Sequence, residues 1–169
     1  MLTELEERRK KKLEELKEGP LIPETKSIFH ETSLKNYKGR SYILPPENMQ
    51  IKPHKCYIPK KLIKAYAGHT KAVSVVRFYP RYGHFLLSGS YDNTVKLWDV
   101  NSHRRCVRTY KGHTEAVRDI CFANDGLHFL SAGFDTLTHY WDTETGKVIH
   151  SFPNDKIPFV VRFNPKPDE

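Results

Sequence analysis

The chain has 169 residues, enough for one ordinary domain with an additional arm but too few for two full domains. It carries 28 Lys and Arg against 20 Asp and Glu, a formal net charge of +8, and 38% of its residues are hydrophobic. No stretch approaches the ~18 consecutive apolar residues of a membrane span, and the charged start does not fit a secretory signal. The three cysteines form no C-x-x-C pair, which argues against a disulfide framework. We therefore expect a soluble intracellular protein in a reducing compartment.

The first region, residues 1–18, is predicted to form a charged helix. Thr3 and Glu6 can form a capping box at its start, and Glu4 and Arg8 are one of several oppositely charged pairs at i,i+4. Its leucines make an apolar stripe that is too thin to bury well. We expect a solvent-exposed helix, with docking against a partner helix as the alternative.

The second region, residues 19–60, is predicted to be an extended basic arm. Residues 19–65 contain nine Lys and Arg against three acidic residues, so they hold +6 of the net charge. Prolines block helix and central strand, while scattered apolar residues can anchor the arm along another surface. Its positive charge favours an anionic partner such as nucleic acid or an acidic protein face, and a solvated linker is the alternative.

The third region, residues 61–169, contains an internal repeat. Gly68-His69 recurs 44 residues later as Gly112-His113, and Trp98-Asp99 recurs 43 residues later as Trp141-Asp142. The residues between these marks also agree, and turn signals separate alternating apolar segments. The predicted strands are 61–66, 72–79, 84–90, 94–99, 105–110, 116–122, 127–133, 136–142, 147–152 and 158–163.

These repeats resemble WD repeats, the four-stranded blades of a β-propeller. The fold class is therefore all-β: an incomplete WD40-type propeller of two blades and part of a third, preceded by a helical and extended N-terminal arm. The resemblance places one hydrogen-bonded set of four residues in each blade. The first set is His69, Ser88, Asp92 and Trp98, and the second is His113, Ser131, Asp135 and Trp141.

A Ser-His-Asp grouping also suggests a hydrolase triad. Here, however, the histidine's neighbours recur in both repeats, the serine has no G-x-S-x-G elbow, and a tryptophan stands where substrate would enter. The sequences His54-Lys55-Cys56 and His103-Arg104-Arg105-Cys106 lack the second ligand pair of a zinc site, and no glycine-rich phosphate loop is present. We expect no catalytic residue, no metal and no cofactor.

Two features depart from the repeat. Thr138-His139-Tyr140 stands where the first repeat has Lys96-Leu97, which places larger polar side chains on an inner strand. Pro153-Asn154 stands in place of the third Gly-His. Because propellers close with about four to eight blades, we expect the chain to be part of a longer protein, with closure by self-assembly as the alternative.

Several segments, in the arm and in the repeat region, narrow the resemblance. They include Tyr37-Lys38-Gly39-Arg40-Ser41-Tyr42 in the arm, the stretch 55–61 and the stretch 104–109. With the repeats, they closely resemble the pre-mRNA-processing factor 17 family of WD-repeat second-step splicing factors, over residues 28–165. The resemblance implies a nuclear, non-enzymatic scaffold of the spliceosome, whose arm and propeller bind splicing proteins. Candidate partner-binding residues are Tyr37, Gly39, Arg40, Tyr42, Lys60, Lys61 and Lys64.

On this interpretation the partners are spliceosomal proteins, with snRNA or pre-mRNA as a further partner of the basic arm. No membrane and no small-molecule substrate is expected. A generic WD40 adaptor, such as a substrate receptor of a ubiquitin ligase, is the alternative. The arginine that such receptors often carry two residues after Trp-Asp is absent, because Asn101 and Glu144 occupy those places.

Overall fold

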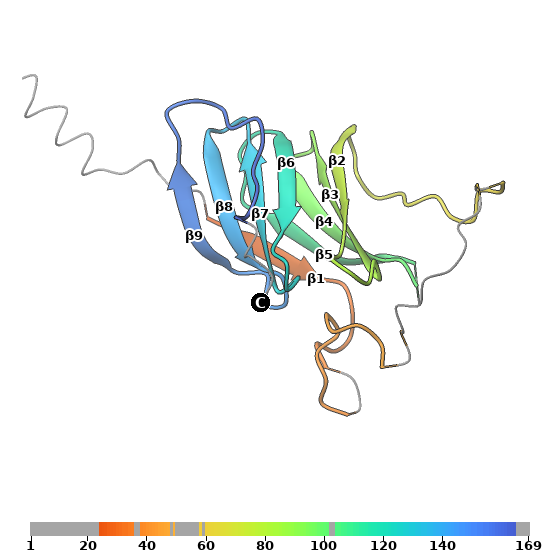
Figure 1. Cartoon of the computed structure of the whole chain (residues 1–169). Coiled ribbons are helices and arrows are strands. Elements are labelled where there is room, and N and C mark those ends of the chain that lie inside the picture. Colours follow the sequence, from red (N-terminus) through yellow and green to blue (C-terminus); the bar gives the residue numbers. More distant parts are fainter. Residues whose placement is uncertain are drawn as a thin grey trace, which may run out of the picture.

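The computed structural model describes residues 24–35, 38–47, 49, 58, 60–101 and 104–164. The helix predicted within 1–18 lies outside these residues. Every named element of the described part is a β-strand, and the strands form two antiparallel sheets side by side (Figure 1). None of the described segments is a helix of the length and apolar character needed to cross a membrane.

The first sheet has five strands in the order β1-β5-β4-β3-β2, and the second has four in the order β6-β7-β8-β9. The strands of the first sheet are β1 (Lys26–Phe29), β2 (Val73–Phe78), β3 (Phe85–Ser90), β4 (Thr94–Asp99) and β5 (Cys106–Lys111). Those of the second are β6 (Val117–Phe122), β7 (His128–Gly133), β8 (Leu137–Asp142) and β9 (Val148–Pro153).

The two sheets repeat each other in detail. The turn between the second and third strands of each repeat contains a residue with positive φ, Asn93 at 65° and Thr136 at 61°. The pairing register shifts just before the tryptophan in both sheets, at Leu97/Trp98 and at Tyr140/Trp141. Equal sequence spacing thus produces equal turns and equal bulges.

A hydrophobic core lies between the sheets, where β2 and β3 pack against β6. Val75 and Leu87 of the first sheet and Val117 and Ile120 of the second belong to it. The same core contains Ile43, a residue of the predicted arm, whose side chain is fully buried. The arm therefore packs against the sheets at Ile43.

Eight of the predicted strands are present, with ends that differ by at most one residue. The strands predicted at 61–66 and 158–163 were wrong, because the described residues there have no strand conformation. A β-strand needs a neighbouring strand for its backbone hydrogen bonds, and no described strand pairs with either segment. The sequence prediction missed β1, which occupies the outer edge of the first sheet instead.

Candidate functional site

The first set of four polar residues links the loop before β2 to the middle of its sheet. The His69 ring lies 2.8 Å from Asp92 Oδ2 through Nδ1 and 2.7 Å from Ser88 Oγ through Nε2. Trp98 Nε1 donates to the same Ser88 Oγ over 2.8 Å. Burial alone would raise the pKa of Asp92, but hydrogen bonds from Thr94 and His69 outweigh it and lower this pKa to about 2.

The second set has the same geometry in the second sheet. His113 Nδ1 lies 3.0 and 2.9 Å from the two Asp135 carboxylate oxygens, and Nε2 lies 2.7 Å from Ser131 Oγ. Trp141 Nε1 donates to Ser131 Oγ over 2.8 Å. The structure thus brings together all eight residues that the repeat singled out.

This arrangement suits a structural role. Ser88 and Ser131 are 3% and 0% exposed, and each hydroxyl oxygen is already engaged by a histidine and an indole. A hydroxyl held between two protein groups has no access to a substrate carbonyl. Each set instead fixes the Gly-His loop to its sheet and satisfies buried polar groups.

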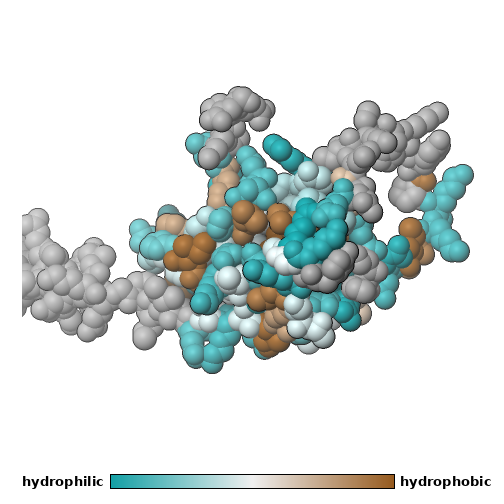
Figure 2. All heavy atoms as spheres, turned by 90° about the horizontal axis from the view of Figure 1, so that it is seen from below, coloured by the Kyte–Doolittle hydropathy of each residue, from teal (hydrophilic) through white to brown (hydrophobic). Residues whose placement is uncertain are grey.

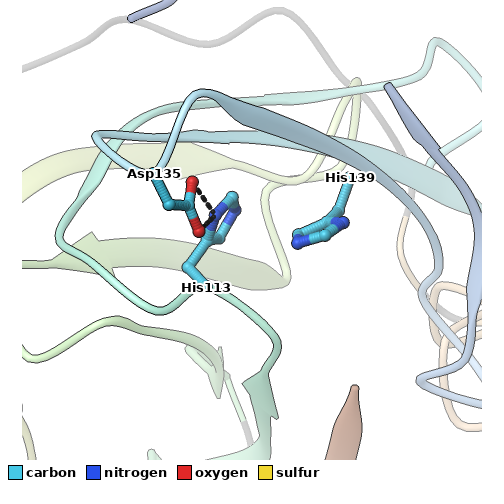
Figure 3. Close-up of side chains that lie close together, drawn as sticks. All are labelled: His113, Asp135 and His139. Carbon is cyan, nitrogen blue, oxygen red and sulfur yellow. Dashed lines mark hydrogen bonds and ion pairs between the residues drawn. The ribbon is translucent and has the colours of Figure 1, made fainter. Parts of the chain in front are cut away.

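The two blades differ at the residue two positions before the tryptophan. In the first, Lys96 Nζ donates to Thr109 Oγ1 of the neighbouring strand over 2.9 Å. In the second, the fully buried His139 contacts Ser151 Oγ through Nδ1 over 2.7 Å. Burial and the nearby His113 lower the pKa of His139 to about 4, and the two imidazole rings are 4.5 Å apart (Figure 3).

The arm forms a docked strand on the first blade. β1 pairs antiparallel with β5 along its whole length, and beyond it the His30 amide donates to Val107 O over 2.8 Å. The His30 ring reaches Thr109 Oγ1 at 3.0 Å, and Arg105 makes two hydrogen bonds to the Glu31 carboxylate. An exposed β5 edge is thereby covered by a segment roughly 80 residues earlier in the chain.

Arg108 on β5 joins the arm to both blades. Its side chain is buried, and its guanidinium donates to Tyr42 Oη, Ser27 Oγ and the backbone oxygen of Glu144 in the second blade, over 2.8 to 3.3 Å. The group also lies 4.7 Å from the centre of the Phe29 ring. A buried arginine is stable only with such partners, so the arm supplies what this residue requires.

A second arm contact lies at the start of β3. His84 Nε2 donates to Ile43 O over 2.8 Å, and the Ile43 side chain enters the core. Tyr42 packs against Phe29 and Phe85, and its hydroxyl donates to the backbone of the β8–β9 turn. Burial lowers the pKa of His84, in keeping with a neutral imidazole beneath the arm.

The predicted partner-binding residues fall into separate places. Tyr37 lies outside the described residues, as do His54, Cys56 and His103. Gly39 is exposed with φ of 74°, and Arg40 donates to Pro45 O over 2.8 Å and pairs with Glu47. Tyr42 faces the first blade, as described above. The structure therefore places Arg40 and Tyr42 in contacts within the chain.

Lys60, Lys61 and Lys64 are all exposed, on a segment that extends away from the sheets (Figure 1). Three large apolar side chains accompany them: Ile58 is 85% exposed, Leu62 80% and Ile63 76%. Figure 2 shows separate brown patches within a largely teal surface, and the same segment projects at the right-hand edge of that view. Exposed apolar groups flanked by cations are typical of an interaction surface.

Sequence reasoning missed two features that hold the arm, β1 and Arg108. It counted Ile43 among the scattered apolar anchors of the arm but did not place it in the core of the sheets. The only signal for β1 was the short apolar pair Ile28-Phe29. Arg108 lies in the stretch 104–109, which contributed to the family resemblance but was given no role in holding the arm. Its actual partners lie in the arm and in the second blade, at separations that a local pattern does not show.

Comparison with known proteins defines the class. Residues 60–99 and 104–142 match the family model described as "WD domain, G-beta repeat". Each match covers the inner strands of one sheet together with its set of four polar residues. The chain is a WD-repeat protein, and its two sheets are blades of the β-propeller type.

Similarity over nearly the whole length of the chain identifies the family more closely than the repeats do. The chain is 47% identical to pre-mRNA-processing factor 17 of Homo sapiens over 99% of its own length, and 39% identical to the Saccharomyces cerevisiae protein of that name over 82%. It is 35% identical to WD repeat-containing protein 25 of Mus musculus over 74%, which covers 23% of that protein. The chain belongs to the pre-mRNA-processing factor 17 family. It spans about 30% of the length of the human protein and 32% of the yeast protein.

Proposed function

We propose that the chain serves pre-mRNA processing as a non-enzymatic scaffold in the nucleus, acting in the second step of splicing. The observation that carries this proposal is that similarity to the human factor 17 protein covers 99% of the chain, including the arm outside the repeats. A likeness confined to the blades would indicate only the WD class, which serves many unrelated functions.

A binding role also suits the chemistry of the described residues. The side chains of the Ser-His-Asp groups are occupied by hydrogen bonds within the structural sets, and both serine hydroxyls are buried. The blades present rigid surfaces and the arm adds a strand to one of them. Such a platform can hold several partners in fixed positions without any chemical step.

The partner surface that we favour is the segment 58–64. Lys60, Lys61 and Lys64 supply positive charge, and Ile58 and Ile63 supply apolar area that is otherwise left in water. An acidic splicing protein with an apolar groove would match both properties. Arg40 contributes less in this account, because Pro45 and Glu47 already engage its guanidinium.

Co-purification tests this proposal. The triple variant Lys60→Ala, Lys61→Ala, Lys64→Ala should lose most of the splicing proteins that the tagged chain captures from nuclear extract. A matched control replaces three other exposed lysines by alanine: Lys71, Lys147 and Lys156. This control variant should still capture the splicing proteins. Equal capture by both triple variants, or no splicing protein with the wild-type chain, would contradict the proposal.

Direct RNA contact is the second candidate, favoured by the same lysines. Each phosphate contact adds a salt-dependent term, so loss of three contacts should lower the slope of log affinity against log salt by about 2 for single-stranded RNA. Fluorescence anisotropy with a labelled RNA measures this slope. A slope unchanged by the triple substitution would assign these lysines to protein partners instead.

A further inference from the structure

The second blade contains a group of metal-binding side chains without a counterpart in the first. His113, Asp135 and His139 each offer a ligand atom, and these atoms all lie within 4.8 Å of one another. They come from the loop after β5, the turn between β7 and β8, and β8 itself (Figure 3). In the first blade Lys96 occupies the place of His139, and an ammonium group has no lone pair for a metal.

His139 provides a second and independent indication. The residue is fully buried, and its Nε2 makes no hydrogen bond of normal geometry among the described residues, although the nearby Gly112 backbone also interacts with the ring. Figure 3 shows its ring extending toward the His113–Asp135 pair. Nδ1 is held by Ser151, so the ring has the usual arrangement of a metal-binding histidine, with one nitrogen oriented by a hydrogen bond and the other without one of normal geometry.

We propose that His113 Nδ1, the Asp135 carboxylate and His139 Nε2 bind a divalent first-row metal ion, with Zn²⁺ the best match to this donor set. Zinc takes imidazole nitrogen and carboxylate oxygen at about 2.0–2.2 Å, which places two ligands of a tetrahedral site about 3.3 Å apart. His113 Nδ1 and the Asp135 oxygens are already 2.9 and 3.0 Å apart. The His139 ring closes the remaining gap, a movement of up to about 1.5 Å.

The contacts of the structural set can be kept on metal binding, but the hydrogen bond between His113 and Ser131 reverses, and the Ser131 hydroxyl proton must turn to another acceptor. With the metal on Nδ1, the His113 ring carries its proton on Nε2 and donates it to Ser131 Oγ. That oxygen already accepts from Trp141, and a hydroxyl oxygen has two acceptor lone pairs. The metal thus replaces the proton shared by His113 and Asp135, and water or an outside ligand fills the fourth position. No sequence motif announces this site, because its ligands come from a loop, a turn and a strand.

Titration of the full chain with ZnCl₂ in a calorimeter tests the site, with Co²⁺ as a spectroscopic probe. The wild-type chain should bind one equivalent and develop the visible absorption of four-coordinate Co²⁺. His139→Lys, which installs the residue of the first blade, should bind at least tenfold more weakly. The control His150→Gln removes an exposed histidine of the same blade and should bind as the wild type does.

Two results would overturn the proposal. In the first, the wild-type chain binds neither Zn²⁺ nor Co²⁺. In the second, a folded His139→Lys variant binds the metal as tightly as the wild type does. If His139→Lys fails to fold, nitrogen-15 NMR of the wild-type imidazoles decides. A Zn²⁺-induced shift of His139 Nε2 and His113 Nδ1 supports the site, and unchanged resonances refute it.

Discussion

The two blades share one network of polar residues but are completed in different ways. The first blade receives its fifth strand, β1, from the arm, and its Lys96 donates a hydrogen bond to Thr109 on β5. The second places a buried histidine at the same position, and no described strand covers the outer edge of β9. A repeat therefore specifies the inner strands and turns, while the outer edge and the residue two positions before the tryptophan differ between the blades.

Removal of the tryptophans should have the largest effect. Trp141 is 1% exposed, stacks on Phe129 and contacts Tyr110 of the first blade, so Trp141→Ala should lower the free energy of unfolding by about 3–5 kcal/mol. Trp98→Ala should cost less, because Trp98 contacts Tyr66 on a segment without a strand. Urea denaturation measures both values. A larger loss of stability for Trp98→Ala than for Trp141→Ala would contradict this difference between the blades.

Truncation of Ile43 tests whether the arm belongs to the core of the first blade. Ile43→Ala should lower the free energy of unfolding by about 2–4 kcal/mol, since it empties a fully buried site. Leu44→Ala is the matched control, because Leu44 is the next residue in the chain and its side chain is 42% exposed. Equal and small effects in the same denaturation experiment would mean that the arm contributes nothing to the core.

Arg108→Met keeps the length of the side chain but removes its hydrogen bonds to the arm and to the second blade. We expect a loss of about 2–3 kcal/mol, because buried acceptors lose a charged donor. Limited proteolysis should also cut the arm near Ser27 faster than in wild type. A stable variant with an uncut arm would show that β1 pairing alone holds the segment.

The second blade should lose stability in mild acid. With a chelator present, His139 has a pKa of about 4 in the folded chain against an ordinary 6.5. The unfolded state therefore binds more protons between these values, and stability falls as the pH drops from 6.5 to 4, on the order of 2 kcal/mol. His139→Lys should flatten this part of the profile. Identical profiles for the two chains would contradict the assignment of a buried neutral His139.

The smallest effect on stability concerns the pair between the exposed Arg105 and the half-buried Glu31. Arg105→Met should barely change stability, because a surface ion pair gains little over its hydration. Thermal melts of Arg105→Met and Arg108→Met compare how much each arginine contributes to stability. A loss as large as that of Arg108→Met would show that the pair, and not the buried guanidinium, holds the arm.

Sequence predicted the parts of the fold that are local within a repeat. Eight strands follow from spacing, and the sets around His69 and His113 follow from the resemblance to WD repeats. Both are local, because turns and their polar partners lie within about 25 residues of each other. The pairing of Ile28 with Thr109 spans 81 residues and leaves no such trace. The departure at His139 was visible, but its approach to His113 depends on the packing of β8 against a distant loop.

Hydrogen exchange on the full chain tests the central claim, that the arm forms the fifth strand of the first blade. The His30 amide, bonded to Val107 O, and the β1 amides that face β5 should exchange as slowly as those of β5. Residues 60–66, which form no strand, should exchange rapidly in the same sample. Rapid exchange at His30 and throughout β1, beside a protected β5, would contradict the claim.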